Sequence, residues 1–381
     1  MKAKTRHNEI FETLKGEILS GKYSGNSHFP SDNALARRFN AGRQTVYWAV
    51  SKLSDMGLVW RKRGAGTFLT REAKRNGGPI AVIAPSFPSS EIFPVICNEL
   101  SLICQENGRL FCYADEHSES AKDALSRLKA FVKRMSEHGV AGVIFRPVDY
   151  YENSAEINFE ITSAIRKAGI PLVLLDCEIG EPDVSSGFDV VGIDNMVAGM
   201  RLGRHIVERG AKRVLFLSRA RASVNVRLRQ IGIEAALDGV REARMECVRM
   251  PDGGLPELTS RIRKFKPDAI LCSGDIVAAH VLKILSRMRL RVPDDVLVAG
   301  VDDVEIARMT TPPLTTIRQP CAEIARAAFD MLMWRTAHPD AVPRRVALAA
   351  ELVVRESTGK GFHQNRDAIK SVKTSKGAKR Q

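Results

Sequence analysis

The chain has 381 residues, of which 44% are hydrophobic and 27% charged, a composition typical of a globular protein with two or three domains. No apolar run reaches the roughly 20 residues that a membrane-spanning helix requires, and the amino-terminal residues lack the apolar segment of a secretory signal. The seven cysteines form no CxxC pair and show no metal-ligand spacing. This pattern is typical of reduced thiols, so we expect a cytoplasmic protein rather than a membrane or disulfide-rich secreted one.

The net charge of +14 is concentrated at the two ends of the chain. Residues 1–79 contain 15 Lys or Arg against 6 Asp or Glu, and residues 358–381 contain 7 against 1. Residues 80–357, by contrast, contain 36 Lys or Arg against 37 Asp or Glu and are nearly neutral. Basic ends beside a neutral body indicate that the ends contact phosphate groups while the body has a different task.

Residues 8–69 predict three helices followed by a two-stranded hairpin. Apolar residues recur every four positions in 8–20, and a second helix begins at Ser31, whose hydroxyl can cap it. After the break at Asn40-Ala41-Gly42, a third helix is predicted from Arg43 to Asp55. Two short strands then enclose a basic, Gly-rich turn at residues 61–66. A short helix pair with polar side chains at the start of its second member, followed by a basic wing, is typical of proteins that read duplex DNA.

From Ile80 onward, short apolar strands alternate with helices of about 10–15 residues, a pattern that predicts βαβ units and parallel sheets. Because about 270 residues exceed one open sheet, we expect two α/β lobes. The predicted strands are 80–84, 110–114, 140–145, 171–176, 190–193, 213–218, 246–250, 268–272 and 296–300, with a last one near 346–353.

The amino-terminal motifs resemble the winged helix-turn-helix of the GntR family: Phe29-Pro30-Ser31-Asp32, Leu35-Ala36-Arg37-Arg38-Phe39, Arg43-Gln44-Thr45-Val46 and Gly64-Ala65-Gly66-Thr67-Phe68. The resemblance implies DNA contacts at Ser31, Asn33, Arg43, Gln44, Thr45, Tyr47, Arg63, Gly64 and Gly66. Arg can pair with guanine and Gln with adenine, and wing glycines let the backbone approach phosphates. Gly42 and Tyr47 depart from the family pattern, so the base preference is not transferable. The alternative is a basic face on a winged helix that docks protein.

The body resembles the periplasmic-binding-protein-like core of the LacI/GalR family, in stretches that include PDAILCSGDIVAAHVLKIL and GVDDVEIARMTTPPLTTIRQP. We therefore predict an α+β winged helix-turn-helix followed by an α/β two-lobed periplasmic-binding-protein-like domain, a chimera of the arabinose-repressor type. The resemblance implies a DNA-binding domain at 1–70, a linker at 71–79, an effector-binding and dimerisation body at 80–357, and a basic disordered tail at 358–381.

The same resemblance implies an effector site at Arg229, Asp275 and Asp302, since open α/β sheets bind ligands where their strands end. A guanidinium with two carboxylates can bond several hydroxyls of one sugar. On the first lobe, Phe87 and Phe93 are predicted to stack on a sugar ring, with Arg146 and Asp176 as polar contacts. Taken alone, Asp275 could instead cap a helix, Asp302 form a turn and Arg229 lie on the surface.

The chain contains no GxGxxG, Walker, HExxH or GxSxG motif, so we predict no catalytic residue, cofactor or metal. We predict a homodimeric transcriptional repressor that binds double-stranded operator DNA and responds to a small carbohydrate. The alternatives are a regulator with a purine or other non-sugar effector, a transport-type sugar-binding protein, and an enzyme with a regulatory head. A transport protein leaves the basic head unexplained.

Overall fold

The computed structural model describes residues 6–19, 22–23, 28–70, 78–84, 92–114, 120–149, 151–179, 185–219, 223–250 and 255–359. Phe87, most of the predicted linker and nearly all of the predicted tail lie outside these residues. None of the helices described is both long and apolar enough to cross a bilayer.

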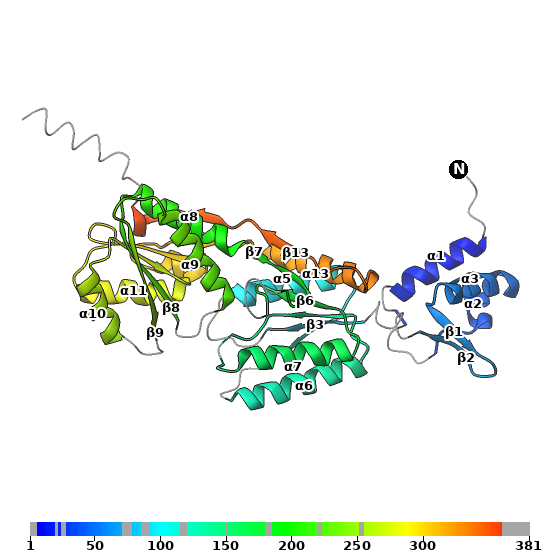
Figure 1. Ribbon diagram of the computed structural model, residues 1–381. Coiled ribbons are helices and arrows are strands. Elements are labelled where there is room, and N and C mark those ends of the chain that lie inside the picture. Colours follow the sequence, from blue (N-terminus) through cyan, green and yellow to red (C-terminus); the bar gives the residue numbers. More distant parts are fainter. Residues whose placement is uncertain are drawn as a thin grey trace, which may run out of the picture.

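The head consists of three helices and a hairpin, as predicted: α1 (Arg6–Leu19), α2 (Asp32–Phe39), α3 (Arg43–Asp55), β1 (Val59–Lys62) and β2 (Gly66–Leu69) (Figure 1). The hydroxyl of Ser31 accepts a hydrogen bond from the backbone N–H of Ala34 at 3.3 Å, which confirms the predicted cap. The helices pack their apolar sides into a common core to which α1 contributes Ile10, Leu14 and Ile18. This core fixes the direction in which α3 presents its polar side.

The first lobe is a parallel sheet of order β13-β7-β6-β5-β3-β4. Alternate residues of β3 face opposite layers, so Ile80 and Val82 pack with α5 and α13, whereas Ala81 and Ile83 pack with α6 and α7. The elements are β3 (Ile80–Ile83), α5 (Ile92–Glu106), β4 (Phe111–Ala114), α6 (Ala121–Glu137), β5 (Gly142–Phe145), α7 (Ser154–Lys167), β6 (Leu172–Leu175), β7 (Asp189–Ile193), α13 (Cys321–Ala337) and β13 (Arg345–Leu348).

The second lobe is a sheet of order β14-β12-β11-β10-β8-β9, parallel except for β14. Its elements are α8 (Asn195–Glu208), β8 (Arg213–Arg219), α9 (Val224–Leu237), β9 (Arg244–Met250), α10 (Leu255–Phe265), β10 (Ala269–Cys272), α11 (Asp275–Arg287), β11 (Leu297–Asp302), α12 (Glu305–Met309), β12 (Thr315–Arg318), β14 (Glu351–Val353) and a 3₁₀ turn, Glu356–Thr358. Along the described chain, the backbone passes between the lobes after β7, after β12 and between β13 and β14.

The prediction of a single last strand near 346–353 is wrong. Residues 345–348 pair with β7 in the first lobe, whereas residues 351–353 pair with β12 in the second. Apolar alternation predicts extended backbone, but it carries no information on which sheet edge supplies the hydrogen bonds. The two predicted lobes are confirmed, and β12 (Thr315–Arg318) is a strand that the prediction did not include.

Glu17 supplies a pH-dependent contribution to the stability of the head. Hydrogen bonds from Arg38 first, and from Lys22 and Tyr23, lower the pKa of Glu17 from 4.5 to about 2 against the opposing effect of burial. The contribution is therefore complete above the unfolded pKa and is lost as the pH falls toward 2. We expect Glu17→Gln to lower the free energy of unfolding by about 1 kcal/mol at pH 7, a value kept small because the pair is partly solvated. Denaturant unfolding at pH 7 and pH 3 should show this difference shrinking at the lower pH.

Candidate DNA-reading surface and effector site

The polar residues predicted to contact DNA lie on the outer side of the head. Arg43 and Gln44 are exposed at the start of α3, Thr45 is half-buried, and Asn33 is exposed on α2. The cap residue, Ser31, lies just before α2. These side chains therefore lie at or near the amino-terminal ends of α2 and α3, where the positive dipole end of a helix favours phosphate.

The turn between β1 and β2 forms the predicted wing. Arg63 is exposed there, and Gly64 and Gly66 have φ of 78° and 109°. Both angles fall in the left-handed region that side chains other than glycine rarely adopt, so the tight, basic turn depends on these two glycines.

Tyr47 is joined to the wing by a contact that the sequence reasoning missed. The guanidinium of Arg61 on β1 lies 4.6 Å from the centre of the Tyr47 ring and donates to Asp32 at 3.3 Å. One cation thus connects α2, α3 and the wing. The available signal was the basic run at residues 61–63, but the run by itself does not show which of its cations reaches α3.

Arg146 follows β5 and brings two predicted residues of the first lobe together. Its guanidinium lies 5.1 Å from the centre of the Phe93 ring and donates to both oxygens of Asp149, at 2.7 and 2.5 Å. The Nε of Arg146 is buried without a partner among the described residues. A buried donor without a partner favours a ligand acceptor at this position.

Asp176 connects the first lobe with α9, since its backbone carbonyl accepts a hydrogen bond from Asn225 at 3.0 Å. Removal from water raises the pKa of Asp176, and the positive charges of Arg146 and Arg229 oppose this shift. Arg229 is buried in the second turn of α9, where its Nε donates to Asn195 at 2.7 Å and its Nη1 donates to the carbonyl of Ser273 at 2.8 Å. Arg229 is therefore not a surface charge, since it ties α8, α9 and the end of β10 together.

Asp275 and Asp302 lie side by side at the ends of β10 and β11. Burial, and then the charge of Asp302, raise the pKa of Asp275. Both Asp275 oxygens are occupied by its own lobe, because Thr316 donates to one at 2.6 Å and the backbone of Val304 to the other at 3.1 Å. The helix cap at this point is Gly274, so Asp275 does not cap α11.

Gln319 is a further candidate that the sequence reasoning missed. Its Nε2 donates to Asp302 at 2.7 Å, and its Oε1 is buried without a partner among the described residues. The residue follows β12 directly, so its position at a strand end was a usable signal. The hydrogen bond therefore links the ends of β11 and β12 through these two side chains.

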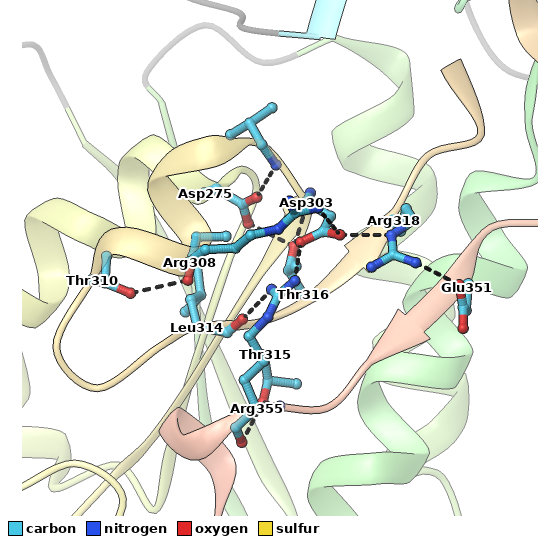
Figure 2. A network of polar contacts seen from close by, with 12 residues as sticks. Asp275, Asp303, Arg308, Thr310, Leu314, Thr315, Thr316, Arg318, Glu351 and Arg355 are labelled. Carbon is cyan, nitrogen blue, oxygen red and sulfur yellow. Dashed lines mark hydrogen bonds and ion pairs between the residues drawn. The ribbon is translucent and has the colours of Figure 1, made fainter. Parts of the chain in front are cut away.

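Asp303, the residue after Asp302, lies within a network of polar contacts in the second lobe (Figure 2). Burial by itself would raise the pKa of the Asp303 carboxylate, which is fully buried. Hydrogen bonds from Arg318 and Arg355 outweigh that effect and lower the pKa. Arg318 also pairs with Glu351 on β14 at 3.1 Å. Asp302 and Asp303 have φ of 118° and 56°, a strained pair that the arginines hold in place.

A cavity of about 70 Å³ lies where the lobes meet. It is lined from the first lobe by residues that include Asp176, Glu178 and Arg345, and from α8 and α9 by Asn195 and Asn225. It is smaller than the roughly 300 Å³ of common ligand pockets. Phe87 falls outside the described residues, and no group of His, Cys, Asp and Glu among those described could hold a metal ion.

A winged helix-turn-helix on a two-lobed α/β body is the arrangement expected of a GntR/LacI-type transcriptional regulator, and both parts match known families. Residues 6–69 match the family of bacterial regulatory proteins, gntR family, and residues 204–358 match the periplasmic binding protein-like domain. The two predicted resemblances are thereby confirmed.

Many known proteins are similar to this chain, among them two repressors and a regulator of known structure. The arabinose metabolism transcriptional repressor of Geobacillus stearothermophilus is 23% identical over 94% of this chain and 99% of its own length. The HTH-type transcriptional repressor PurR of Mannheimia succiniciproducens is 29% identical over 61% of this chain and 69% of its own. A LacI family regulator from Enterococcus faecium, solved with bound ribose, has a TM-score of 0.59 at 20% identity and covers 74% of this chain and 98% of its own.

Proposed function

We propose that the protein is a repressor whose affinity for an operator is set by a small carbohydrate bound between its two lobes. The observation that carries this proposal is the row of polar groups at strand ends in both lobes. Arg146 and Asp176 lie at strand ends of the first lobe, Asp302 ends β11 and Gln319 follows β12 in the second, and Arg229 is buried where α8, α9 and the end of β10 meet. Such a row can bond several hydroxyls of one ligand.

Ligand binding across the row would favour a closed arrangement of the lobes. The effect on DNA requires only that the ligand bind one arrangement more tightly than the other. We propose that the body dimerises, so that two heads read a palindromic operator, and that the chain works in the cytoplasm as head (1–70), linker (71–79), body (80–357) and tail (358–381). In this proposal Asp275 supports Asp302 and α12 from within its own lobe.

Arg43→Ala tests the DNA-binding half of the proposal. We expect specific operator binding to weaken by about 1–3 kcal/mol, because Arg43 is exposed at the start of α3, where a bidentate contact with guanine is possible. Binding would be measured by fluorescence anisotropy on a duplex enriched from genomic DNA. Arg241→Ala, which removes a charge far along the chain, is the matched control. Unchanged affinity of Arg43→Ala would remove this residue from the interface.

Asp302→Asn tests the effector half. Calorimetry with a panel of pentoses, hexoses and disaccharides should yield a sugar that binds the wild type. We expect that sugar to bind Asp302→Asn roughly 10- to 100-fold more weakly, since a buried hydrogen bond to a charged group is worth about 1.5–3 kcal/mol. Asp294→Asn alters an exposed carboxylate and should bind normally. No heat with any sugar would refute a carbohydrate effector.

A nucleobase is the second candidate effector, because a relative that is 29% identical over 61% of this chain carries the name PurR. Guanine and hypoxanthine therefore belong in the same calorimetric panel, and heat with these alone would favour this candidate. We propose no catalytic step for the body. A bound sugar recovered unchanged after prolonged incubation would support that view, and turnover would contradict it.

A further inference from the structure

Trp48 lies on the side of α3 that faces away from the core of the head. Its side chain is 59% exposed, although folded proteins usually bury most of an indole. The opposite side of the helix is defined by Val46, Ala49, Val50 and Leu53, which are all fully buried. Successive helical residues are rotated by about 100°. The side of α3 opposite the buried residues therefore carries Gln44 and Trp48, which stand four positions apart.

The two flanks of α3 are already engaged by other parts of the head. On one flank, Arg61 covers the ring of Tyr47. On the other, Lys52 donates to Asn8 at 3.3 Å and lies 4.4 Å from the centre of the Phe11 ring. The face that carries Gln44 and Trp48 is therefore the one left to enter a groove.

We propose that Trp48 is a specificity-determining residue that contacts the C5-methyl group of a thymine in the major groove. The inference rests on the DNA-binding function proposed above. The partner is DNA because the head is basic: residues 1–79 have an excess of nine positive charges, Arg43 is exposed at the start of α3, and Arg63 is exposed in the wing. Within the major groove, the thymine methyl is the apolar group that base edges present, so it is the matching contact for an indole.

The position of Gln44 adds a prediction about the operator. Side chains at i and i+4 on a helix lie about 5–6 Å apart at their Cβ atoms, close to two base-pair steps of about 3.4 Å. Gln44 suits adenine, and Trp48 suits thymine. We therefore expect the contacted half-site to hold an adenine and a thymine within two steps of each other.

The test removes single methyl groups from the DNA. The full chain enriches a randomised duplex library, and each thymine of the enriched half-site is then replaced by deoxyuridine, which lacks only the C5-methyl. At one position we expect the wild type to bind about fourfold more weakly, the equivalent of about 0.8 kcal/mol for one buried methyl. Trp48→Ala should bind the enriched duplex at least tenfold more weakly and be insensitive to that replacement, and its own enriched sequences should no longer require thymine there.

Met56→Ala is the matched control, since it removes another exposed apolar side chain just beyond the end of α3 and should leave affinity within twofold. Retention by Trp48→Ala of both the thymine preference and the sensitivity to deoxyuridine would overturn the inference. A changed oligomeric state of Trp48→Ala with unaltered thymine preference would overturn it as well, in favour of a protein contact. Failure of the wild type to enrich any sequence would instead refute the DNA-binding function itself.

Discussion

Arg335→Ala is expected to lower the free energy of unfolding of the body by about 3–5 kcal/mol, because it leaves a buried carboxylate without its cation. Arg335 on α13 donates to both oxygens of Asp189, at 2.6 and 2.8 Å, and the side chain of Asp189 is fully buried. The same guanidinium donates to the carbonyls of His338, Pro339, Ala341 and Val342. It therefore holds β7, α13 and the segment leading to β13 together.

Urea unfolding can measure this effect in the full chain. Trp334 is the tryptophan of the body, so a Trp48→Phe/Trp60→Phe background lets its fluorescence report the body alone. Arg335→Lys should recover only part of the loss, since an ammonium cannot reproduce two parallel hydrogen bonds. Arg308→Ala is the control, because Arg308 is 64% exposed and its ion pair spans 3.6 Å. A loss under 1 kcal/mol for Arg335→Ala would show that the pair contributes little.

Gly232→Val should have the second large effect, on both stability and effector response. A Cβ at Gly232 would lie 2.0 Å from the carbonyl oxygen of Met196, and one at Gly199 would lie 2.1 Å from that of Arg229. The backbones of α8 and α9 are thus in direct contact, and a side chain at Gly232 must push them apart. Overpacking of this kind costs about 1–3 kcal/mol, and more where backbone must move.

The same displacement would misplace Arg229, whose 2.7 Å hydrogen bond to Asn195 joins these two helices. We expect the effector identified by calorimetry to bind Gly232→Val at least tenfold more weakly, because the buried hydrogen bond between Arg229 and Asn195 would lose its geometry. Gly16→Ala is the control, since no atom lies within 4 Å of its added Cβ and alanine favours helix. Normal effector binding by a folded Gly232→Val would contradict the assigned role of the α8–α9 contact.

Much of the fold could be predicted because the apolar residues repeat with the periods of helix and strand. The stripe of Val46, Ala49, Val50 and Leu53 placed α3 correctly from Arg43 to Asp55. Continuous apolar runs such as Ile80–Ile83 indicated strands buried on both faces, and they are. The strand near 346–353 was misjudged because its two halves hydrogen-bond to different sheets.

By itself the sequence determined the two-part architecture, the charged head and the residues at strand ends, since these depend on local pattern, composition and motif spacing. The tertiary structure decided which of those residues contact one another. Asp275 and Asp302 look equivalent as strand-end acids, yet Thr316 and Val304 occupy the first, whereas Gln319 joins the second. Likewise, Arg61 reaches Tyr47 only because the hairpin folds back on α3. Contacts between residues distant in sequence depend on how elements pack, and the pattern along one segment does not encode them.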